Sequence, residues 1–160
     1  MVREMLRTDW NEMTAIYLQS LKKGDVTFRT DCPDYSEWDK EHIKECRYVC
    51  ELDGKVVGYT MIAPTSSRDS YRGVVELSIF VDDSHLHKGI GTQLLKKLMV
   101  ESEKKGYWTL YSAIFSCNKP SIELHKKCGF RIIGERKDIA KDRFGKWQST
   151  TIMEWRNSIR

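Results

Sequence analysis

SIFVDDSHLHKGIGTQLLKKL, residues 78–98, passes from an apolar run through an acidic, histidine-rich turn into a segment with leucines at helical spacing. The pattern predicts a β-strand, a tight turn and an amphipathic helix in that order. Gly89 and Gly91 stand at the junction, where glycines usually let the backbone approach another group closely. The stretch raises the question of whether that group is a nucleotide, another phosphate or nothing beyond a tight turn.

The two best-known nucleotide motifs do not fit this turn. A Walker A loop needs four residues between its glycines, whereas a single residue separates Gly89 from Gly91. A Rossmann fingerprint needs a glycine or alanine three residues after the second glycine, where Leu94 stands. Two interpretations remain: a turn without a ligand, or a pyrophosphate bound by the backbone N–H groups of residues 88–92 at a helix N-terminus.

Length and composition predict one globular domain over residues 1–160, with 40% hydrophobic and 31% charged residues. No run approaches eighteen apolar residues and no signal peptide is recognisable, so we expect a cytoplasmic protein without a membrane partner. Five irregularly spaced cysteines predict reduced thiols and no metal site. A net charge of +4, with dispersed basic residues, argues against nucleic acid and is compatible with an anionic small ligand.

Further elements are predicted on both sides of the opening stretch. Strands at residues 74–81 and 109–115 flank a helix at 91–105, and Asp53-Gly54 joins a hairpin of strands 48–52 and 56–62. The remaining predictions are a first strand at 4–7, a helix with a capping box from Asp9 to Glu12, a helix at 36–45, a short helix between Asn118 and Gly129, and strands at 130–134 and 149–155 with a turn at 144–145. This order predicts an α/β (α+β) domain with a mixed sheet that binds ligands at the carboxyl ends of its strands.

Several separate motifs carry a family resemblance. They are VELSIFVDDSHLHKGIGTQLLKKLM, then NKPSIELHKKCGF about thirty residues later, and IYLQSLKKGDVTFRTDCPDYSEW, GYTMIAPTSSRDSYRGVVE and KDRFGKWQSTTIMEW elsewhere. Together they resemble the GCN5-related N-acetyltransferase (GNAT) superfamily, in its phosphinothricin/methionine sulfoximine acetyltransferase, or L-amino-acid N-acyltransferase, branch. The resemblance implies the GNAT fold: a single mixed, mostly antiparallel central sheet of six to seven strands flanked by about four helices.

The resemblance also implies acetyl-CoA as acyl donor and no metal. By analogy the pantetheine arm would bond like an extra strand along Ile79, Phe80 and Val81, and a backbone N–H near Val81 would polarise the thioester carbonyl. The other implied cofactor-binding residues are His87, Lys88, Gly89, Ile90, Gly91, Thr92, Asn118, Ser121 and Lys127. One position departs from the superfamily pattern, because Leu86 stands where arginine or glutamine is usual.

Amine acetylation requires that the acceptor ammonium lose a proton before it attacks the thioester. Glu76 is an acidic residue in the apolar run VVELSIFV and matches the family's strand glutamate, so it is the predicted general base. Partial burial would raise its pKa toward the useful range. The alternatives are a carboxylate that faces solvent or one that only binds the ammonium. His125 stands where many superfamily members carry an acid tyrosine, and its implied role is acid, proton relay or orienting group.

The acceptor is predicted from SSRDSYR, which resembles the family's substrate loop. Arg68 and Arg72 are the candidates to hold a substrate carboxylate, with Asp69, Ser70 and Tyr71 beside them, and Phe28 resembles an aromatic wall. The predicted activity is direct acetyl transfer to a small amino acid or analogue in a ternary complex, by a homodimer. The alternatives are a peptide N-terminus, a polyamine or an aminoglycoside as acceptor, or a non-catalytic acyl-CoA-binding module.

Overall fold

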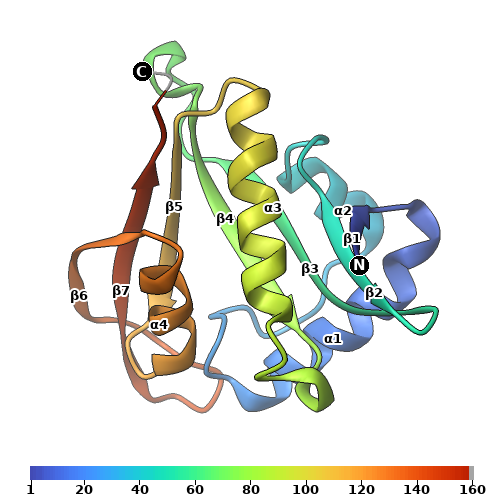
Figure 1. Cartoon of the computed structure of the whole chain (residues 1–160). Helices are drawn as coiled ribbons and strands as arrows, with labels where there is room; N and C mark the ends of the chain where they lie inside the picture. The colour runs from blue at the N-terminus through green and yellow to red at the C-terminus, as the bar shows by residue number, and fades with distance from the viewer. Residues whose placement is uncertain (159–160) are drawn as a thin grey trace.

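A seven-stranded sheet runs through the computed structural model, which describes residues 1–158 (Figure 1). The strand order is β1-β2-β3-β4-β5-β7-β6, and β4 and β5 form its parallel pair while the other pairs are antiparallel. The strands are β1 (Val2–Glu4), β2 (Tyr48–Leu52), β3 (Lys55–Pro64), β4 (Val74–Val81), β5 (Thr109–Phe115), β6 (Arg131–Lys141) and β7 (Trp147–Arg156). The helices are α1 (Trp10–Lys23), α2 (Tyr35–Glu41), α3 (Ile90–Lys104) and α4 (Lys119–Lys127). The predicted mixed, mostly antiparallel sheet is confirmed.

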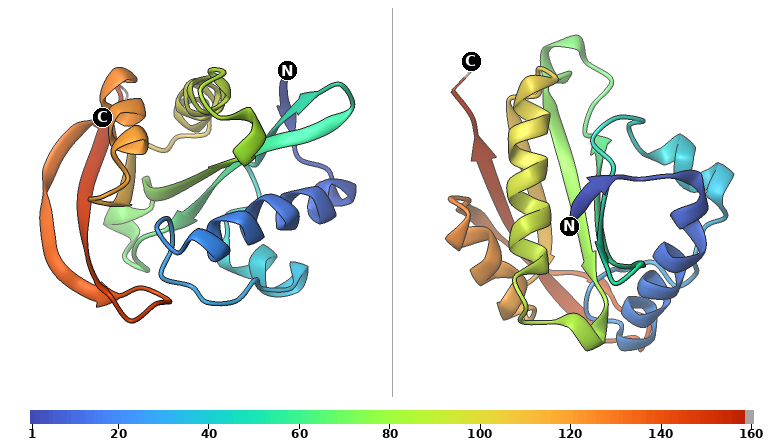
Figure 2. Two further views of the ribbon diagram at one scale, coloured as in Figure 1. Left: turned by 90° about the horizontal axis from the view of Figure 1, so that it is seen from below. Right: turned by 45° about the vertical axis from the view of Figure 1, so that its right-hand side comes forward.

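The helices cover both faces of the sheet, with α1 and α2 on one face and α3 and α4 on the other (Figure 2). Leu94, Leu95 and Leu98 of α3 are fully buried in a core cluster that includes Val75 and Leu77 of β4. Phe80 of β4 belongs to a second cluster with residues of α1 and α2. Because side chains alternate along a strand, Glu76 and Ser78 share the α1/α2 face with Phe80.

The parallel pair β4–β5 separates part-way along its length. Only Val74–Glu76 pair with Thr109–Tyr111, although β4 continues to Val81 and β5 to Phe115. The two strands diverge beyond this point, as Figure 1 shows. The separation leaves an opening in the sheet, bordered by two strand edges that lack a partner strand there.

The predicted beginning of the chain is wrong in detail. The first strand lies at Val2–Glu4 and not at 4–7, because Arg7–Asp9 form a 3-10 turn. The Asp9 carboxylate accepts hydrogen bonds from Leu6 N at 2.7 Å and Arg3 Nη1 at 2.9 Å, so it caps the 3-10 turn and makes no cap hydrogen bond to α1. The Glu12 carboxylate accepts a hydrogen bond from Val56 N at 2.9 Å. It therefore links α1 to β3 and does not take part in the expected capping box.

The bounds of several other elements also differ from prediction. The helix expected at 36–45 ends at Glu41, because the Arg47 guanidinium donates to the carbonyl oxygens of His42 and Ile43 that a longer helix would use. The last two strands are longer than predicted, since β6 is an exposed edge strand that lacks a clear apolar alternation. Among residues 1–158, no helix has the length and apolar composition that crossing a membrane requires.

The predicted turn between β6 and β7 is confirmed and packs against α1. The Asp142 carboxylate holds the turn by accepting from Phe144 N at 2.9 Å and Lys146 N at 3.0 Å. Arg143 Nη1 donates to Leu21 O at 2.5 Å. A Cβ at Gly24 would lie 2.7 Å from Phe144 Cε2, so the turn sits directly on the C-terminus of α1. These contacts hold the turn between β6 and β7 against the C-terminus of α1.

Candidate functional site

A cavity of about 250 Å³ fills the opening between β4 and β5. Its walls come from residues 76–80 of β4, residues 112–115 of β5, residues 26–28 after α1, and α4. Seven residues predicted from the sequence line it: Phe28, Glu76, Ile79, Phe80, Asn118, Ser121 and His125. Residues from four distant segments therefore meet where the parallel pair separates.

A groove continues from this cavity to the N-terminus of α3. Val26, Ile79, Phe80, Asn118 and Ser121 also line the next hollow along the surface, which reaches Val81, Leu86 and His87. That hollow in turn shares residues with a third, lined by the predicted Gly89, Ile90, Gly91, Thr92 and Lys127. Lys88 is exposed and lines none of these hollows. The groove joins the strand edge of β4 to the glycine turn.

The two glycines of the turn have different roles. Gly89 is the N-cap residue of α3 with φ +78°, a left-handed conformation that favours glycine, and a Cβ there would meet nothing. A Cβ at Gly91 would lie 2.9 Å from Leu124 Cδ2, so its absence lets the first turn of α3 approach α4. The N–H groups in that first turn have no intrahelical acceptor, which makes the turn suited to an anion. Gly91 thus has a packing role that the sequence did not reveal.

Glu76 is half-buried on the α1/α2 face of the sheet and lines the cavity. Burial raises the pKa of its carboxyl group above the ordinary value, while a hydrogen bond from Tyr111 and the charge of Arg136 oppose that rise. Tyr111 is the register partner of Glu76 across the parallel pair, and burial beside this carboxylate raises the pKa of its hydroxyl. Tyr111 was missed because the pairing of β4 with β5 places it there, and no motif marks it in the sequence.

His125 is fully buried on α4, on the opposite face of the sheet. Its Nδ1 lies 2.7 Å from Ser121 O, and since a carbonyl oxygen only accepts, Nδ1–H is the donor. Burial lowers the pKa of the imidazole, so the ring is neutral near pH 7 and its Nε2 is an acceptor. Nε2 is buried and has no hydrogen-bond partner among residues 1–158. A buried acceptor without a donor beside a cavity suits a ligand or a water molecule.

The predicted substrate loop directly precedes β4, at the end of the strand opposite to the glycine turn and at the top of Figure 1. Arg68, Asp69, Ser70, Tyr71 and Arg72 are exposed, and none of them lines the cavity or the groove. Arg72 pairs with Asp69 at 3.4 Å and lies over the Trp108 ring at 5.5 Å. Within one chain, the structure does not bring this loop to Glu76. Phe28 does lie at the cavity, where its ring packs on Phe115 with 4.4 Å between centroids.

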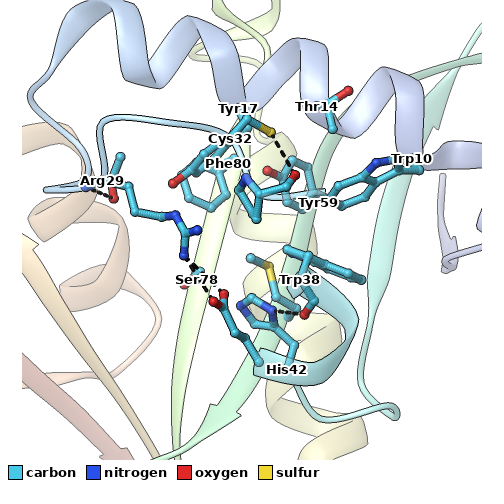
Figure 3. A pocket seen from close by; sticks show the side chains of 14 residues that line it. Trp10, Thr14, Tyr17, Arg29, Cys32, Trp38, His42, Tyr59, Ser78 and Phe80 are labelled. Atoms are coloured by element: carbon cyan, nitrogen blue, oxygen red, sulfur yellow. Dashed lines mark hydrogen bonds and ion pairs between the residues drawn. The ribbon is translucent and has the colours of Figure 1, made fainter. Parts of the chain in front are cut away.

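A second cavity lies between the sheet and helices α1 and α2, and we call it the aromatic chamber (Figure 3). It shares Thr27, Ser78 and Phe80 with the cavity in the sheet opening. Its other lining residues are Trp10, Thr14, Tyr17, Arg29, Cys32, Pro33, Trp38, Glu41, His42, Tyr59 and Met61. None of these was predicted, because the aromatic residues of four separate elements meet only in the folded chain.

Comparisons with known proteins agree with this architecture. The chain is 36% identical over 101 residues to the L-methionine sulfoximine/L-methionine sulfone acetyltransferase of Pseudomonas aeruginosa, a match that covers 63% of the chain and only 58% of that relative. It is 30% identical over 159 residues to the phosphinothricin N-acetyltransferase of Alcaligenes faecalis, covering 96% and 80% of the two chains.

A solved structure shares the fold closely. The phosphinothricin acetyltransferase of Sinorhizobium meliloti, in complex with acetyl-CoA, superposes with a TM-score of 0.89 at 27% identity, covering 98% of this chain and 87% of that one. The model of the acetyltransferase (GNAT) family matches residues 5–130. The fold and the family expected from the sequence are thereby confirmed: the chain belongs to the acetyltransferase (GNAT) family.

Proposed function

We propose that the protein is an acetyl-CoA-dependent N-acetyltransferase for the amino group of a small amino acid or analogue of the phosphinothricin or methionine sulfoximine type. The observation that carries this proposal is the cavity in the sheet opening, which half-buried Glu76 lines and from which a groove runs to the N-terminus of α3. The names of the relatives support the acceptor class. The proposed unit is one domain over residues 1–160, of which 159 and 160 lie outside the described residues.

The groove fits acetyl-CoA. The β4 edge beyond Glu76 has no partner strand and offers backbone groups to the amides of a pantetheine arm, in the manner of an added strand. The first turn of α3 offers N–H groups to a pyrophosphate, and Lys127 of α4 lines the same hollow. Asn118 Oδ1 accepts from Ser121 N at 3.4 Å, which leaves its side-chain amide free to donate toward the groove. The bound thioester supplies an electrophilic carbonyl carbon, and Val81 N–H is the proposed donor to its oxygen.

Glu76 is the proposed general base. Its carboxylate takes a proton from the acceptor ammonium, directly or through water, and the neutral amine then forms the new N–C bond. The C–S bond breaks in the same transfer, and the thiolate that leaves must gain a proton. His125 is neutral and its Nε2 is unprotonated, so it does not start as the acid. After the N–C bond forms, the acceptor nitrogen still carries one surplus proton, and His125 suits a relay that takes this proton at Nε2 and passes it to the leaving sulfur.

We further propose a cytoplasmic homodimer. The outer strand β6, the following turn and the first residue of β7 expose large apolar side chains, and exposed apolar patches commonly mark protein contacts. They are Ile132, Ile133, Ile139, Phe144 and Trp147. Arg68 and Arg72 remain the proposed ligands for the acceptor carboxylate; because neither lines the cavity in one chain, we propose that a loop movement or a second copy brings them to it.

A thiol-release assay with acetyl-CoA tests the function. The acceptor panel contains amino acids, methionine sulfoximine, phosphinothricin, polyamines and peptides. We expect release with amino acids and their analogues. Release confined to polyamines or peptides would overturn the acceptor class, and acetyl-CoA binding by isothermal titration without release on any amine would favour a non-catalytic acyl-CoA-binding module.

Replacing Leu86 should strengthen cofactor binding. Leu86 lines the groove, is 43% exposed and offers no hydrogen bond to a phosphate. In Leu86→Arg we expect a KM for acetyl-CoA lower by about 3- to 10-fold, the modest gain of a partly exposed charged contact. Leu52→Arg, at a similarly exposed leucine on β2, controls for added charge. An equal decrease in both variants would show that net charge and not the turn is responsible.

A further inference from the structure

His85 borders the hollow at the N-terminus of α3. The hollow has a volume of about 430 Å³, and its lining includes Leu86, Gly89 and Gly91 together with His85. His85 is the last residue of a 3-10 turn that directly precedes Leu86, and it is partly buried. An imidazole therefore stands beside the backbone N–H groups of the first turn of α3, which have no acceptor within the helix.

The ring of His85 is held by the carboxylate of Asp82. Nδ1 of the ring lies 2.7 Å from Asp82 Oδ2. Hydrogen bonds from Ser84, Gln19 and His85 hold the pKa of Asp82 well below its ordinary value, so this carboxylate is ionised and only accepts. Nδ1–H is therefore the donor. Within residues 1–158, no group makes a hydrogen bond to the other ring nitrogen, Nε2.

Helix α1 fixes the two acidic residues of this turn. Gln19 Nε2 donates to Asp82 Oδ1 at 2.7 Å, and Gln19 Oε1 accepts from Asp83 N at 2.9 Å. Lys23 Nζ lies 2.7 Å from Asp83 Oδ1. The pair of Asp82 and His85 is thus organised before any ligand arrives, so a ligand that binds to the ring has little ordering to drive.

The other charged groups that face the ring come from α4 and from the turn itself. Lys127 and Glu123 of α4 line the same hollow, and Glu123 pairs with Lys126 at 3.5 Å. His87 lines the hollow from the turn. The lining contains no arginine, because Leu86 stands where the superfamily usually has arginine or glutamine. Positive charge for an anion must therefore come from Lys127 and from the histidines.

We propose that His85 binds the pyrophosphate of acetyl-CoA and supplies the positive charge that Leu86 lacks. The ring takes up a proton from solvent at Nε2, and it then donates through Nδ1 to Asp82 and through Nε2 to a phosphate oxygen. An anion on each side favours this doubly protonated ring, so binding of the cofactor and protonation of the ring strengthen each other. The inference rests on the proposed function, because it assumes that acetyl-CoA occupies the groove.

Isothermal titration with acetyl-CoA tests the contact without turnover. His85→Phe keeps a ring but removes both nitrogens, and its dissociation constant should be about 10-fold higher than that of the wild type, the effect of one charge-assisted hydrogen bond. Lys22→Gln is the control, because Lys22 is an exposed cation of α1 that lines no part of the groove. An equal increase in Lys22→Gln would show that net charge is responsible and would overturn the contact.

Donors that lack phosphates separate a phosphate contact from a loosened turn. S-Acetylpantetheine has the thioester and the arm but no phosphate, so its dissociation constant should be the same in His85→Phe and in the wild type. Equal weakening of both donors would mean that the substitution disturbs the groove, and the contact would be wrong. With 3′-dephospho-acetyl-CoA the loss in His85→Phe should persist. A loss that disappears with this donor would assign the ring to the 3′-phosphate and overturn the pyrophosphate contact.

The pH dependence gives a signature that a purely structural role lacks. The ratio of the dissociation constants, His85→Phe to wild type, should fall toward 1 as pH rises from about 6 to about 9, because the ring then loses its second proton. The measurement uses 3′-dephospho-acetyl-CoA, whose phosphates stay ionised over this range. His87 and Lys127 are present in both proteins, so their titration cancels in the ratio. A ratio that is constant with pH would contradict a charged contact.

Binding and turnover together separate this inference from the proposed function. If the wild type binds acetyl-CoA and His85→Phe binds it more weakly, but no amine is acetylated, the transferase function fails and the contact stands. If amines are acetylated and the two proteins bind acetyl-CoA equally, the contact fails and the transferase function stands. A wild type that does not bind acetyl-CoA would overturn both.

Discussion

Glu76→Gln is expected to lower kcat by about 10²- to 10⁴-fold, the usual contribution of a positioned general base. The amide keeps the size of the carboxylate and its hydrogen bond from Tyr111, but it accepts no proton. Acetyl-CoA binding measured by isothermal titration should be unchanged, because the groove residues are untouched. Glu51→Gln is the control: Glu51 is a partly buried carboxylate on β2 that pairs with Arg3 at 2.9 Å, and β3 lies between β2 and β4.

The pH dependence sharpens this prediction. Burial raises the pKa of Glu76, so the kcat/KM of the wild type should fall as pH decreases through that raised value, and this limb should be absent in Glu76→Gln. A raised pKa also means that ionisation of Glu76 destabilises the folded state. The free energy of unfolding therefore falls as pH rises from the ordinary pKa of the carboxyl group to its raised pKa in the fold, and is constant above that. The free energy of unfolding of Glu76→Gln at pH 7 should therefore equal or exceed that of the wild type. Full kcat across the pH range would remove Glu76 from the role of base.

His125→Phe is expected to lower kcat by about 100-fold, the smaller end of the range for proton transfer. Phenylalanine keeps the ring and its edge contact with Phe130, 5.0 Å away, but removes Nε2 and the hydrogen bond to Ser121 O. The KM for acetyl-CoA and the dissociation constant measured by titration should change by no more than about threefold.

A purely structural role of His125 predicts a different outcome. In that case the loss of the bond to Ser121 O would loosen α4, which also carries Lys127, and acetyl-CoA binding would weaken together with turnover. A kcat within about threefold of the wild type, with an unaltered pH profile, would exclude the relay. Thermal unfolding of the variant, followed by circular dichroism, establishes that the helix is retained at the assay temperature.

The central part of the fold could be predicted because local patterns and tertiary packing agree there. The strand at residues 74–81 and the strand at 109–115 are found with those bounds, and the helix between them is shifted by one residue. The predictions failed where a distant side chain decides the local structure. Arg47 ends α2 early, and Arg3 draws the Asp9 carboxylate away from the expected cap. Such long-range hydrogen bonds cannot be predicted from the hydrophobic periodicity within a single segment.

The candidate site was predictable on its cofactor side and much less so on its acceptor side. The glycine turn and Asn118 lie in contiguous motifs, so the sequence keeps them together. Tyr111 reaches Glu76 only through strand register, and the rings of the aromatic chamber come from two helices and two strands. The loop with Arg68 was predicted from sequence likeness alone, and in one chain it lies apart from the cavity. Recognition of the acceptor depends on surfaces that only folding assembles.

The separation of β4 from β5 has a kinetic consequence. Because β4 and β5 separate beyond Glu76, the sheet has an opening there. The aromatic chamber lies on the α1/α2 side of this opening, and the groove beside α3 and α4 lies on the other side. If acetyl-CoA occupies the groove, as proposed, and the acceptor approaches the opening from the α1/α2 side, neither substrate has to pass the other. Such a geometry imposes no compulsory sequence of arrival, and it predicts intersecting initial-rate patterns of a random sequential mechanism, with each product competing against its own parent substrate.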